Sequence, residues 1–222
     1  MCGRMFQKRG ILTLIDLTMP RDIVEAVKPL LKKLFEDEAN RFDPNFSVCP
    51  TDEVFVLASD ESGAIEPRIM PWGGKPAWAK STLFNSRDDK LEGRAWGSSF
   101  SKRRCLIFCD GFYEWTGPKG DKQAHAISRS DGNPMAFAGL WRVDDDLPWC
   151  SIITTNASPW MEQYHNREPV MIREAQAHDY LASDDPPYDQ IRASSDGEMS
   201  AFATASPKRD LEPKAIKTSL FD

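Results

Sequence analysis

A cysteine stands at the second position of the chain, directly after Met1. When residue two is small, the initiator methionine is normally removed, which would leave Cys2 with a free α-amine beside its thiol. The amine ionises near pH ~8 and the thiol near pH ~8.5, so both have a nucleophilic fraction at neutral pH. An aldehyde could then react twice on one residue, because the amine forms a Schiff base and the thiolate closes a thiazolidine ring intramolecularly. Cysteine at position two also occurs often without any function.

Two further side chains could transfer protons. Glu114 lies in the apolar segment Asp110-Gly-Phe-Tyr-Glu-Trp115, where a cleft floored by aromatic rings would raise its pKa and suit proton transfer. The alternative is an exposed glutamate on an edge strand. His165 lies at an expected helix-to-strand junction, where groups can converge, and its alternative is a capping role. His125 and His178 are interpreted as surface or packing residues.

A polar pair, Asn85 and Arg87, lies within a region rich in Gly and Pro that also holds three tryptophans. Asparagine supplies neutral donors and an acceptor, and arginine supplies a planar fork that fits phosphate. A tryptophan on a loop beside basic residues is a stacking platform for the bases of single-stranded nucleic acid. Alternatively, the three tryptophans of this region, Trp72, Trp78 and Trp96, fold back onto the core.

Composition and charge limit the possible classes of protein. The chain has 222 residues, of which 41% are hydrophobic, enough to bury a real core. Its net charge of −6 argues mildly against a nucleic-acid partner, because phosphate contacts need Lys and Arg. Basic residues are grouped apart from the acidic ones, which fits either one basic face or ordinary solvated surface. Binding to undamaged DNA should therefore be weak and sensitive to salt.

The cysteines argue for a reducing compartment. There are five, an odd number, no segment resembles a signal peptide, and no apolar run approaches membrane-spanning length. We therefore expect a protein of a reducing cytoplasm or nucleoid, with no membrane association. The absence of a CxxC pair argues against zinc, and neither a metal nor an organic cofactor is expected. Cys105 and Cys109 are interpreted as buried thiols.

Hydrophobic periodicity predicts few helices and many strands. A helix is expected over 21–39, kinked or divided in two at Pro29, and shorter helices over 158–165 and 173–182. Turn residues separate seven short apolar runs, which are expected to be strands: 54–57, 65–70, 104–109, 112–115, 124–128, 135–141 and 150–155. Because strands and helices do not alternate, the pattern predicts an α+β fold with a bent, largely antiparallel sheet and a few peripheral helices. The whole chain, 1–222, is expected to form a single domain.

Taken in order along the chain, seven segments resemble the SOS-response-associated peptidase (SRAP) family. They are Met1-Cys2-Gly3-Arg4, Trp72-Gly-Gly-Lys-Pro-Ala-Trp78, Phe84-Asn-Ser-Arg87, Arg104-Cys-Leu-Ile-Phe-Cys-Asp-Gly-Phe-Tyr-Glu-Trp115, Phe137-Ala-Gly-Leu-Trp141, Ile152-Ile-Thr-Thr-Asn-Ala157 and His165-Asn-Arg-Glu-Pro169. No one of these motifs is decisive, but the ordered set is specific and covers nearly the whole chain.

The resemblance implies a compact SRAP fold and covalent cross-linking to abasic sites in single-stranded DNA, with the thiazolidine on Cys2. It implies that Asn85 positions the reacting N-terminus and that Glu114 is the acid/base carboxylate of linkage formation and reversal. It further implies that His165 helps to open the deoxyribose ring. The family is also described as removing its own first methionine. A monomer, bound at the nucleoid when it is on DNA, is expected.

The same resemblance implies a set of DNA contacts. Arg4, Arg87 and Arg167 match positions that contact phosphates, Trp78 lies near where the family packs against bases, and Thr154 matches a position lining the site. Three segments depart from the family pattern: Ser47-Val48-Cys49-Pro50, Asp89 and Pro207-Lys-Arg-Asp210. These departures affect the expected inner wall of the DNA groove and leave the four chemical residues in place.

Two other functions remain possible on the sequence alone. One is a cysteine hydrolase acting on an amide or peptide, with Cys2 as nucleophile and His165 as base. The other is a non-catalytic module that binds single-stranded DNA through aromatic and basic residues. The hydrolase would cleave an amide without DNA, and the binding module would never form a covalent species.

Overall fold

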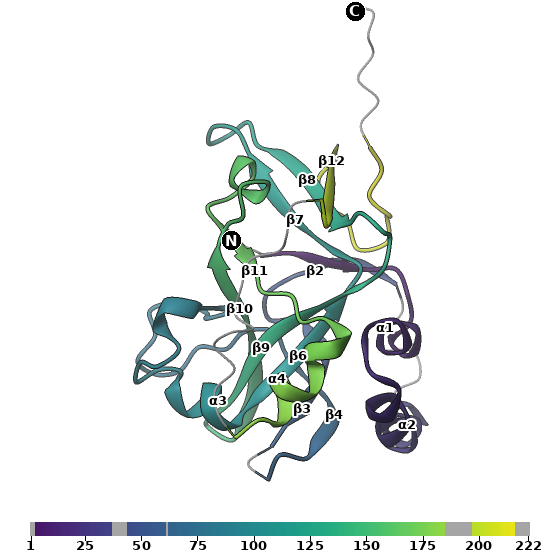
Figure 1. Ribbon diagram of the computed structural model, residues 1–222. Helices are drawn as coiled ribbons and strands as arrows, with labels where there is room; N and C mark the ends of the chain where they lie inside the picture. The colour runs from purple at the N-terminus through teal and green to yellow at the C-terminus, as the bar shows by residue number, and fades with distance from the viewer. Residues whose placement is uncertain (1–2, 37–43, 61, 185–196, 216–222) are drawn as a thin grey trace, which may run out of the picture.

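Two β-sheets that share a hydrophobic core make up most of the computed structural model (Figure 1). The structure describes residues 3–36, 44–60, 62–184 and 197–215. The first sheet, called the small sheet here, has five antiparallel strands in the order β12 (Met199–Thr204), β8 (Gln123–Arg129), β7 (Gly111–Thr116), β1 (Met5–Gln7) and β2 (Asn45–Val48).

The second sheet, called the large sheet, has seven strands. Its order is β11 (Arg167–Pro169), β10 (Leu147–Asn156), β9 (Met135–Asp144), β6 (Arg104–Cys109), β3 (Glu53–Ser59) and β4 (Ile65–Pro71), with β5 (Asn85–Arg87) beside β10. The pairing of β5 with β10 is parallel, and the other printed pairs of this sheet are antiparallel.

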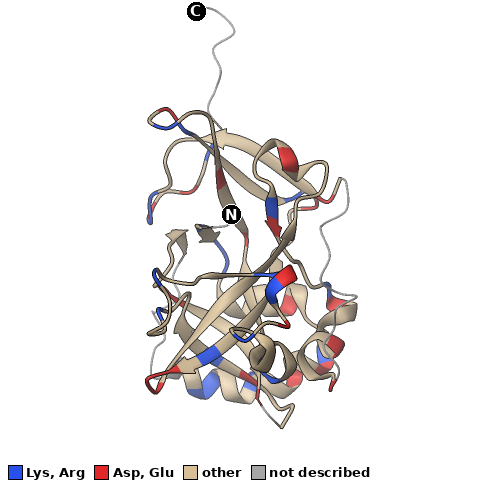
Figure 2. Ribbon diagram, turned by 90° about the vertical axis from the view of Figure 1, so that its left-hand side faces the viewer, with Lys and Arg blue, Asp and Glu red and all other residues tan. Residues whose placement is uncertain are grey.

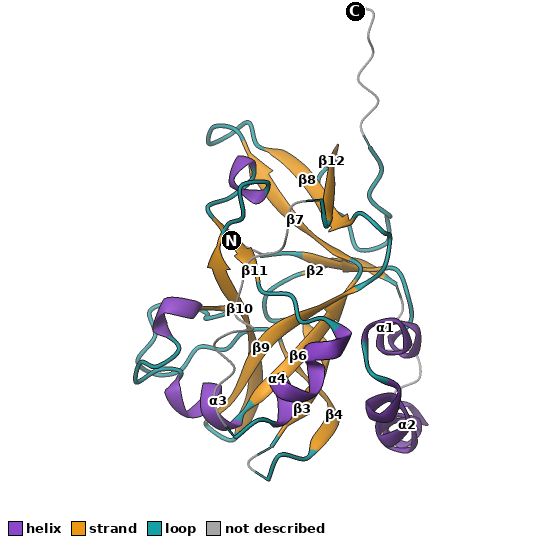
Figure 3. Cartoon of the chain, viewed as in Figure 1, coloured by secondary structure: helices purple, strands orange, loops and turns teal. Residues whose placement is uncertain are grey.

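Helices lie around the large sheet, as Figure 3 shows. The α-helices of the described residues are α1 (Ile11–Thr18), α2 (Arg21–Glu36), α3 (Gly97–Lys102) and α4 (Ala177–Ala182), and the single 3-10 turns are Asp88–Lys90, Met161–Gln163 and Glu174–Gln176. In this part of the chain, no helix is long and apolar enough to cross a bilayer. The predicted α+β class is confirmed, and all seven predicted strands occur, as β3, β4 and β6–β10.

The central strands of the large sheet are buried on both faces. In β3, Phe55 and Leu57 pack with α1, α2 and α4 in one core cluster, whereas Val56 and Ala58 pack with the small sheet in another. Successive side chains of a strand point to opposite faces, so a strand covered on both sides is apolar throughout. This explains why the sequence shows continuous apolar runs instead of alternation.

The predicted helix over 21–39 is confirmed as α2 as far as residue 36, and residues 37–39 lie outside the described residues. The helix continues through Pro29, so the alternative of two short helices is wrong. Its buried stripe includes Val27 and Leu31, while Leu30 is 44% exposed. Because Pro29 itself lies on the exposed side, the helix can keep its apolar face against the large sheet.

The predicted helix over 158–165 is wrong, since only the 3-10 turn Met161–Gln163 forms there. The carboxylate of Glu168 accepts hydrogen bonds from both the backbone N–H and the hydroxyl of Ser158, at 3.1 and 2.9 Å. These bonds close the loop at its base, next to β11. The predicted helix over 173–182 is divided into the 3-10 turn Glu174–Gln176 and α4.

A buried carboxylate anchors the start of the chain. Asp110, which is 3% exposed, follows β6 and accepts hydrogen bonds from the backbone N–H groups of Lys8 (2.7 Å) and Arg9 (3.0 Å). Its other oxygen pairs with the guanidinium of Arg9. Next in the chain, Gly111 has no side chain, and a Cβ there would overlap the ring of Phe6. Together these contacts hold β1 directly against β7.

Replacing Asp110 by alanine should lower the free energy of unfolding by about 2 kcal/mol or more, because two backbone donors and a partly buried guanidinium lose their buried acceptor. Chemical denaturation of the two proteins measures the difference. Asp131→Ala is the matched control, since Asp131 pairs with Arg129 at the surface and should cost under about 1 kcal/mol. Equal losses in the two variants would contradict the anchoring role of Asp110.

Candidate active site

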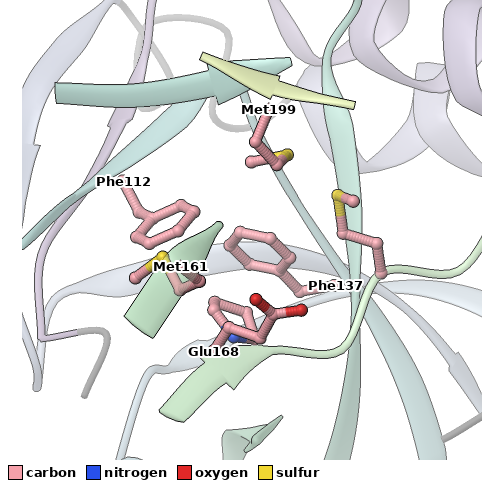
Figure 4. Close-up of a pocket in the computed structure, with 7 residues that line it drawn as sticks. Phe112, Phe137, Met161, Glu168 and Met199 are labelled. Atoms are coloured by element: carbon pink, nitrogen blue, oxygen red, sulfur yellow. The ribbon is translucent and has the colours of Figure 1, made fainter. Parts of the chain in front are cut away.

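The small sheet turns one face toward the large sheet, and this face changes from apolar to polar along its strands. At the apolar end, Phe112 is opposite Ile127, and both belong to the core shared by the two sheets. Further along β7 and β8, Glu114 is opposite His125. Figure 4 shows the apolar end, where Phe112 and Met199 surround a cavity of about 10 Å³. That volume holds at most about one water molecule, so the cavity is a packing gap.

Glu114 stands at the polar end of this face. It is 4% exposed, in a strand flanked by β1 and β8, so the alternative of an exposed glutamate on an edge strand is wrong. Burial raises the pKa of its carboxyl, because desolvation disfavours the charged form. Glu114 therefore retains its proton at a pH where an ordinary glutamate has lost it, as a general acid requires.

His165 follows the 3-10 turn and is half-buried. Its Nδ1 accepts a hydrogen bond from the backbone N–H of Arg167 at 3.0 Å. The side chain thus contacts the chain beyond the turn, so it does not cap the turn. Burial lowers the pKa of the imidazole, and with Nδ1 acting as acceptor the neutral ring carries its proton on Nε2. His165 can therefore donate a hydrogen bond without becoming a cation.

Glu114 and His165 belong to one cluster. His125, beside Glu114, has its ring centroid 5.1 Å from that of Tyr164, the residue immediately before His165. The charge of Lys122 lowers the pKa of both Glu114 and His165, as a secondary effect beside burial. The carboxyl of the small sheet and the imidazole of the loop before β11 are therefore linked through the contact of His125 with Tyr164.

The first described residues of the chain run alongside Glu114. Met5 is opposite Phe112, and the carbonyl oxygen of Arg4 accepts a hydrogen bond from the N–H of Tyr113 at 2.9 Å. Continuing this register by one residue places Gly3 opposite Glu114. Cys2 lies outside the described residues, but its Cα is joined to that of Gly3 by one peptide unit of about 3.8 Å.

Arg4 contributes a cation–π contact at this place. Its guanidinium carbon lies 5.6 Å from the centre of the Trp115 ring. The contact involves the face of the small sheet opposite to Glu114, since neighbouring residues of a strand point to opposite faces.

The remaining predicted residues gather on three adjacent strands of the large sheet. Asn85 is opposite Ile152 in the β5–β10 pair, and Arg87 is opposite Thr154. Across the β10–β11 pair, Arg167 is opposite Asn156. The fold therefore brings four of the predicted residues to one end of the large sheet: Asn85, Arg87, Thr154 and Arg167. Of these, Arg167 is two residues along the chain from His165.

Arg167 and Thr154 are buried, which was not expected of DNA contacts. Arg167 is 7% exposed, and its guanidinium donates to Asn156 Oδ1 (2.9 Å), Asp88 Oδ1 (2.6 Å) and the carbonyl of Thr154. Burial opposes ionisation of Asp88, but hydrogen bonds from Thr155 and Arg167 outweigh it and lower the pKa of Asp88. Thr154 is fully buried. In this conformation both side chains hold the strands together and are not free to contact a phosphate.

Arg87 is the more accessible arginine of this group. Its side chain is 53% exposed and makes two parallel hydrogen bonds of 2.8 Å to the carboxylate of Asp89. Arg129 and Arg142 are likewise paired with aspartates two residues further on. In Figure 2 acidic and basic residues are interspersed in the view shown. Much of the basic character inferred from the sequence is therefore neutralised locally.

The three loop tryptophans have different environments. Trp72 and Trp96 are buried in the core, as the packing alternative proposes, whereas Trp78 is 58% exposed. Trp78 is backed by Arg142, whose guanidinium carbon lies 5.7 Å from its ring centre and also 5.6 Å from that of Trp96. Of the base-stacking surface predicted from the sequence, only Trp78 among these three tryptophans is therefore exposed. Its ring is held by a cation–π contact with Arg142, an interaction worth about 0.5–2 kcal/mol.

A family model described as SOS response associated peptidase (SRAP) matches residues 1–208. The chain belongs to the SRAP family. Relatives named as abasic site processing proteins include YoqW of Bacillus subtilis (strain 168), 31% identical over 162 residues that cover 66% of this chain and 71% of YoqW. YedK of Escherichia coli (strain K12) is 26% identical over 191 residues, covering 82% of this chain and 79% of YedK.

Solved structures have the same fold. A phage-related protein from Bordetella bronchiseptica superposes with a TM-score of 0.71 at 21% identity, covering 92% of this chain and 95% of that one. A protein from Bacteroides thetaiotaomicron superposes with a TM-score of 0.68 at 17% identity, covering 92% of each chain. At these identities the likeness concerns the fold alone, and it confirms the SRAP-like arrangement of the two sheets.

Two of the segments that depart from the SRAP pattern lie near each other in the fold. The backbone N–H of Phe46, in β2, donates to the carbonyl of Arg209 at 2.8 Å. The guanidinium of Arg209 lies 3.4 Å from the carboxylate of Asp52, which also accepts from the N–H of Cys49 at 2.9 Å. The segment 207–210 therefore contacts the residues on either side of 47–50, and Asp52 links Arg209 to the backbone of Cys49. The third departure, Asp89, still holds Arg87.

His165 should titrate below the value of about 6.5 typical of an unperturbed histidine, because burial disfavours the imidazolium. Adding a proton to Nδ1 would also break the hydrogen bond from Arg167. NMR titration of the imidazole resonances measures the pKa, and the nitrogen shifts report the tautomer. A pKa of 6.5 or higher, or a neutral form protonated on Nδ1, would show that the assigned geometry is wrong.

Proposed function

We propose that this SRAP protein captures the ring-opened aldehyde of an abasic site in single-stranded DNA as a thiazolidine on Cys2, once Met1 has been removed. The observation that carries the proposal is the pairing of β1 with β7, which runs the N-terminal segment past the buried Glu114. The names of the relatives as abasic site processing proteins support the same substrate. One copy of the chain acts on one lesion.

Removal of Met1 is the first step. The name of the family refers to a peptidase, and we propose that the peptide bond concerned is the chain's own Met1–Cys2 bond. Hydrolysis of this bond creates the 1,2-aminothiol, so the protein becomes reactive only after it has been processed.

The DNA is held at the end of the large sheet near His165. Arg87 exchanges Asp89 for a phosphate, Arg4 contacts the backbone on the other side of the lesion, and Trp78 stacks on a neighbouring base. Arg167 and Thr154 are buried, so their role is to hold these strands in position and not to contact the DNA directly. Since Arg87, Arg142 and Arg167 are each paired with an aspartate, binding to undamaged DNA is weak and salt-sensitive.

Opening of the sugar is assigned to His165. An abasic deoxyribose exists mostly as a closed hemiacetal, so its aldehyde must first be released. Nε2–H of His165 donates a hydrogen bond to the ring oxygen and stabilises the charge that develops there, while solvent water takes the proton of the C1 hydroxyl and supplies a proton to the ring oxygen as the bond between this oxygen and C1 breaks. The hydrogen bond from Arg167 to Nδ1 fixes the ring so that Nε2 is the donor.

Formation of the thiazolidine is assigned to Cys2 and Glu114. The α-amine adds to C1 to give a carbinolamine, the protonated carboxyl of Glu114 donates to the departing hydroxyl, and one water molecule leaves. The thiolate then attacks the resulting imine carbon, and the nitrogen takes up a proton. Asn85 orients the amine through its neutral amide. The reaction needs no metal, because the aldehyde is already electrophilic, and reversal follows the same steps backward.

A cross-link that survives denaturation is expected with wild-type protein and a single-stranded oligonucleotide carrying one abasic site. Cys2→Ala should abolish the band on a denaturing gel, because it removes the thiol that closes the ring. Cys49→Ala is the matched control, since Cys49 is the half-exposed cysteine of the described residues, and it should leave the band unchanged. An undamaged oligonucleotide should give none.

Absence of the band with wild-type protein would contradict the proposal, provided that mass spectrometry shows Met1 to be removed. Cleavage of an amide substrate without DNA would then favour a cysteine hydrolase. Tight binding of single-stranded DNA that Cys2→Ala leaves intact, with no covalent species, would favour a non-catalytic module.

Glu114→Gln should slow cross-link formation by on the order of 100-fold at low pH, because glutamine cannot donate a proton to the departing hydroxyl. Burial raises the pKa of Glu114, so the wild-type carboxyl is an acid up to that raised pKa and loses this ability above it. The ratio of the wild-type rate to the variant rate should therefore be largest below the raised pKa and decline as pH increases. Single-turnover rates across the pH range test this, and a ratio independent of pH would contradict the acid role.

A further inference from the structure

His125, interpreted from the sequence as a surface or packing residue, lies beside the proposed site. In the small sheet it stands between Glu114 of β7 and Ala203 of β12. Residues directly opposite each other in an antiparallel pair project from the same face with Cβ atoms about 5 Å apart. The imidazole of His125 is therefore the immediate neighbour of the Glu114 carboxyl, and it is half-buried.

Two contacts fix the ring of His125. Its Nε2 lies 2.8 Å from the hydroxyl of Thr116, two residues along β7 from Glu114. Its ring centroid lies 5.1 Å from that of Tyr164, which in turn lies 5.2 Å from the ring of Trp160. The result is a row of rings from the small sheet into the loop that carries His165.

The loop has separate anchors at its two ends. At its start, Ser158 is bound by the buried carboxylate of Glu168, which belongs to the large sheet. At its end, Tyr164 meets His125 of the small sheet. Beyond His165 the loop is bonded to the large sheet again, since the N–H of Ala157 donates to the carbonyl of Asn166 at 3.2 Å. The contact of Tyr164 with His125 joins the loop to the small sheet, one residue away from His165.

We propose that His125 is a positioning residue for the reaction proposed above, on which this inference rests. Its ring holds Tyr164, and through Tyr164 the imidazole of His165, against the strand that carries Glu114, while Thr116 fixes the orientation of the ring. A displacement of about 1 Å can cost on the order of 100-fold in rate, so loss of this contact should affect the chemical step more than DNA binding.

The test compares His125→Ala, which removes the ring, with His125→Phe, which keeps an aromatic ring but neither accepts nor donates a hydrogen bond. Single-turnover cross-linking is measured over a range of abasic oligonucleotide concentrations. His125→Ala should lower the rate at saturation by on the order of tenfold or more, with the half-saturating concentration changed less than about twofold. His125→Phe should restore most of the rate. His178→Ala, at a surface pair with Asp22, is the matched control and should behave as wild type.

Either of two results would overturn the inference. A saturating rate for His125→Ala equal to that of wild type would show that the ring contact is not needed. A rate for His125→Phe as low as that for His125→Ala would show that the reaction requires the imidazole itself and that the packing of an aromatic ring is not sufficient. If thermal unfolding shows that His125→Ala does not fold, Tyr164→Leu removes the same contact from the other side and has the same expected results. Failure of wild-type protein to cross-link would instead contradict the proposed function.

Discussion

The proposed site depends on how the first residues of the chain are held. Three residues of β1 would not stay in a sheet by backbone hydrogen bonds alone, because short isolated pairs are marginal in water. The buried carboxylate of Asp110 supplies the missing fixation, since it binds two backbone N–H groups and the guanidinium that follow β1. Gly111 allows β1 to approach closely. Because this anchor sets the register of β1 on β7, it determines which residue of β7 the N-terminal segment passes, and that residue is Glu114.

The two sheets divide the remaining tasks. Where they pack together, apolar residues such as Phe112 exclude water. Further along, the same face of the small sheet carries Glu114, and the loop before β11 of the large sheet carries His165. A carboxyl and an imidazole at the edge of a core are partly desolvated, which moves their pKa values in opposite directions. The acid retains its proton and the imidazole remains neutral. In their uncharged forms Glu114 can therefore donate a proton and His165 can donate a hydrogen bond.

Much of this fold could be predicted from the sequence, and the failures have physical causes. Apolar runs in the sequence predict long buried strands such as β6 and β9, and hydrophobic periodicity predicts α2. The short strand β5 does not, because Asn85 and Arg87 are polar and the strand exists only through its pairing with β10. For the site, residue types indicated Glu114, but burial of Arg167 arises from acceptors far along the chain. His125 was missed for the same reason, since its importance comes from its neighbours in the sheet.

Mass spectrometry of the digested cross-link tests the central claim most directly. The account predicts an N-terminal peptide beginning at Cys2, with a mass equal to peptide plus abasic oligonucleotide minus one water, and resistant to borohydride because a thiazolidine contains no imine. A cross-link located instead on a lysine such as Lys122, or one that borohydride must reduce before it survives, would contradict the account.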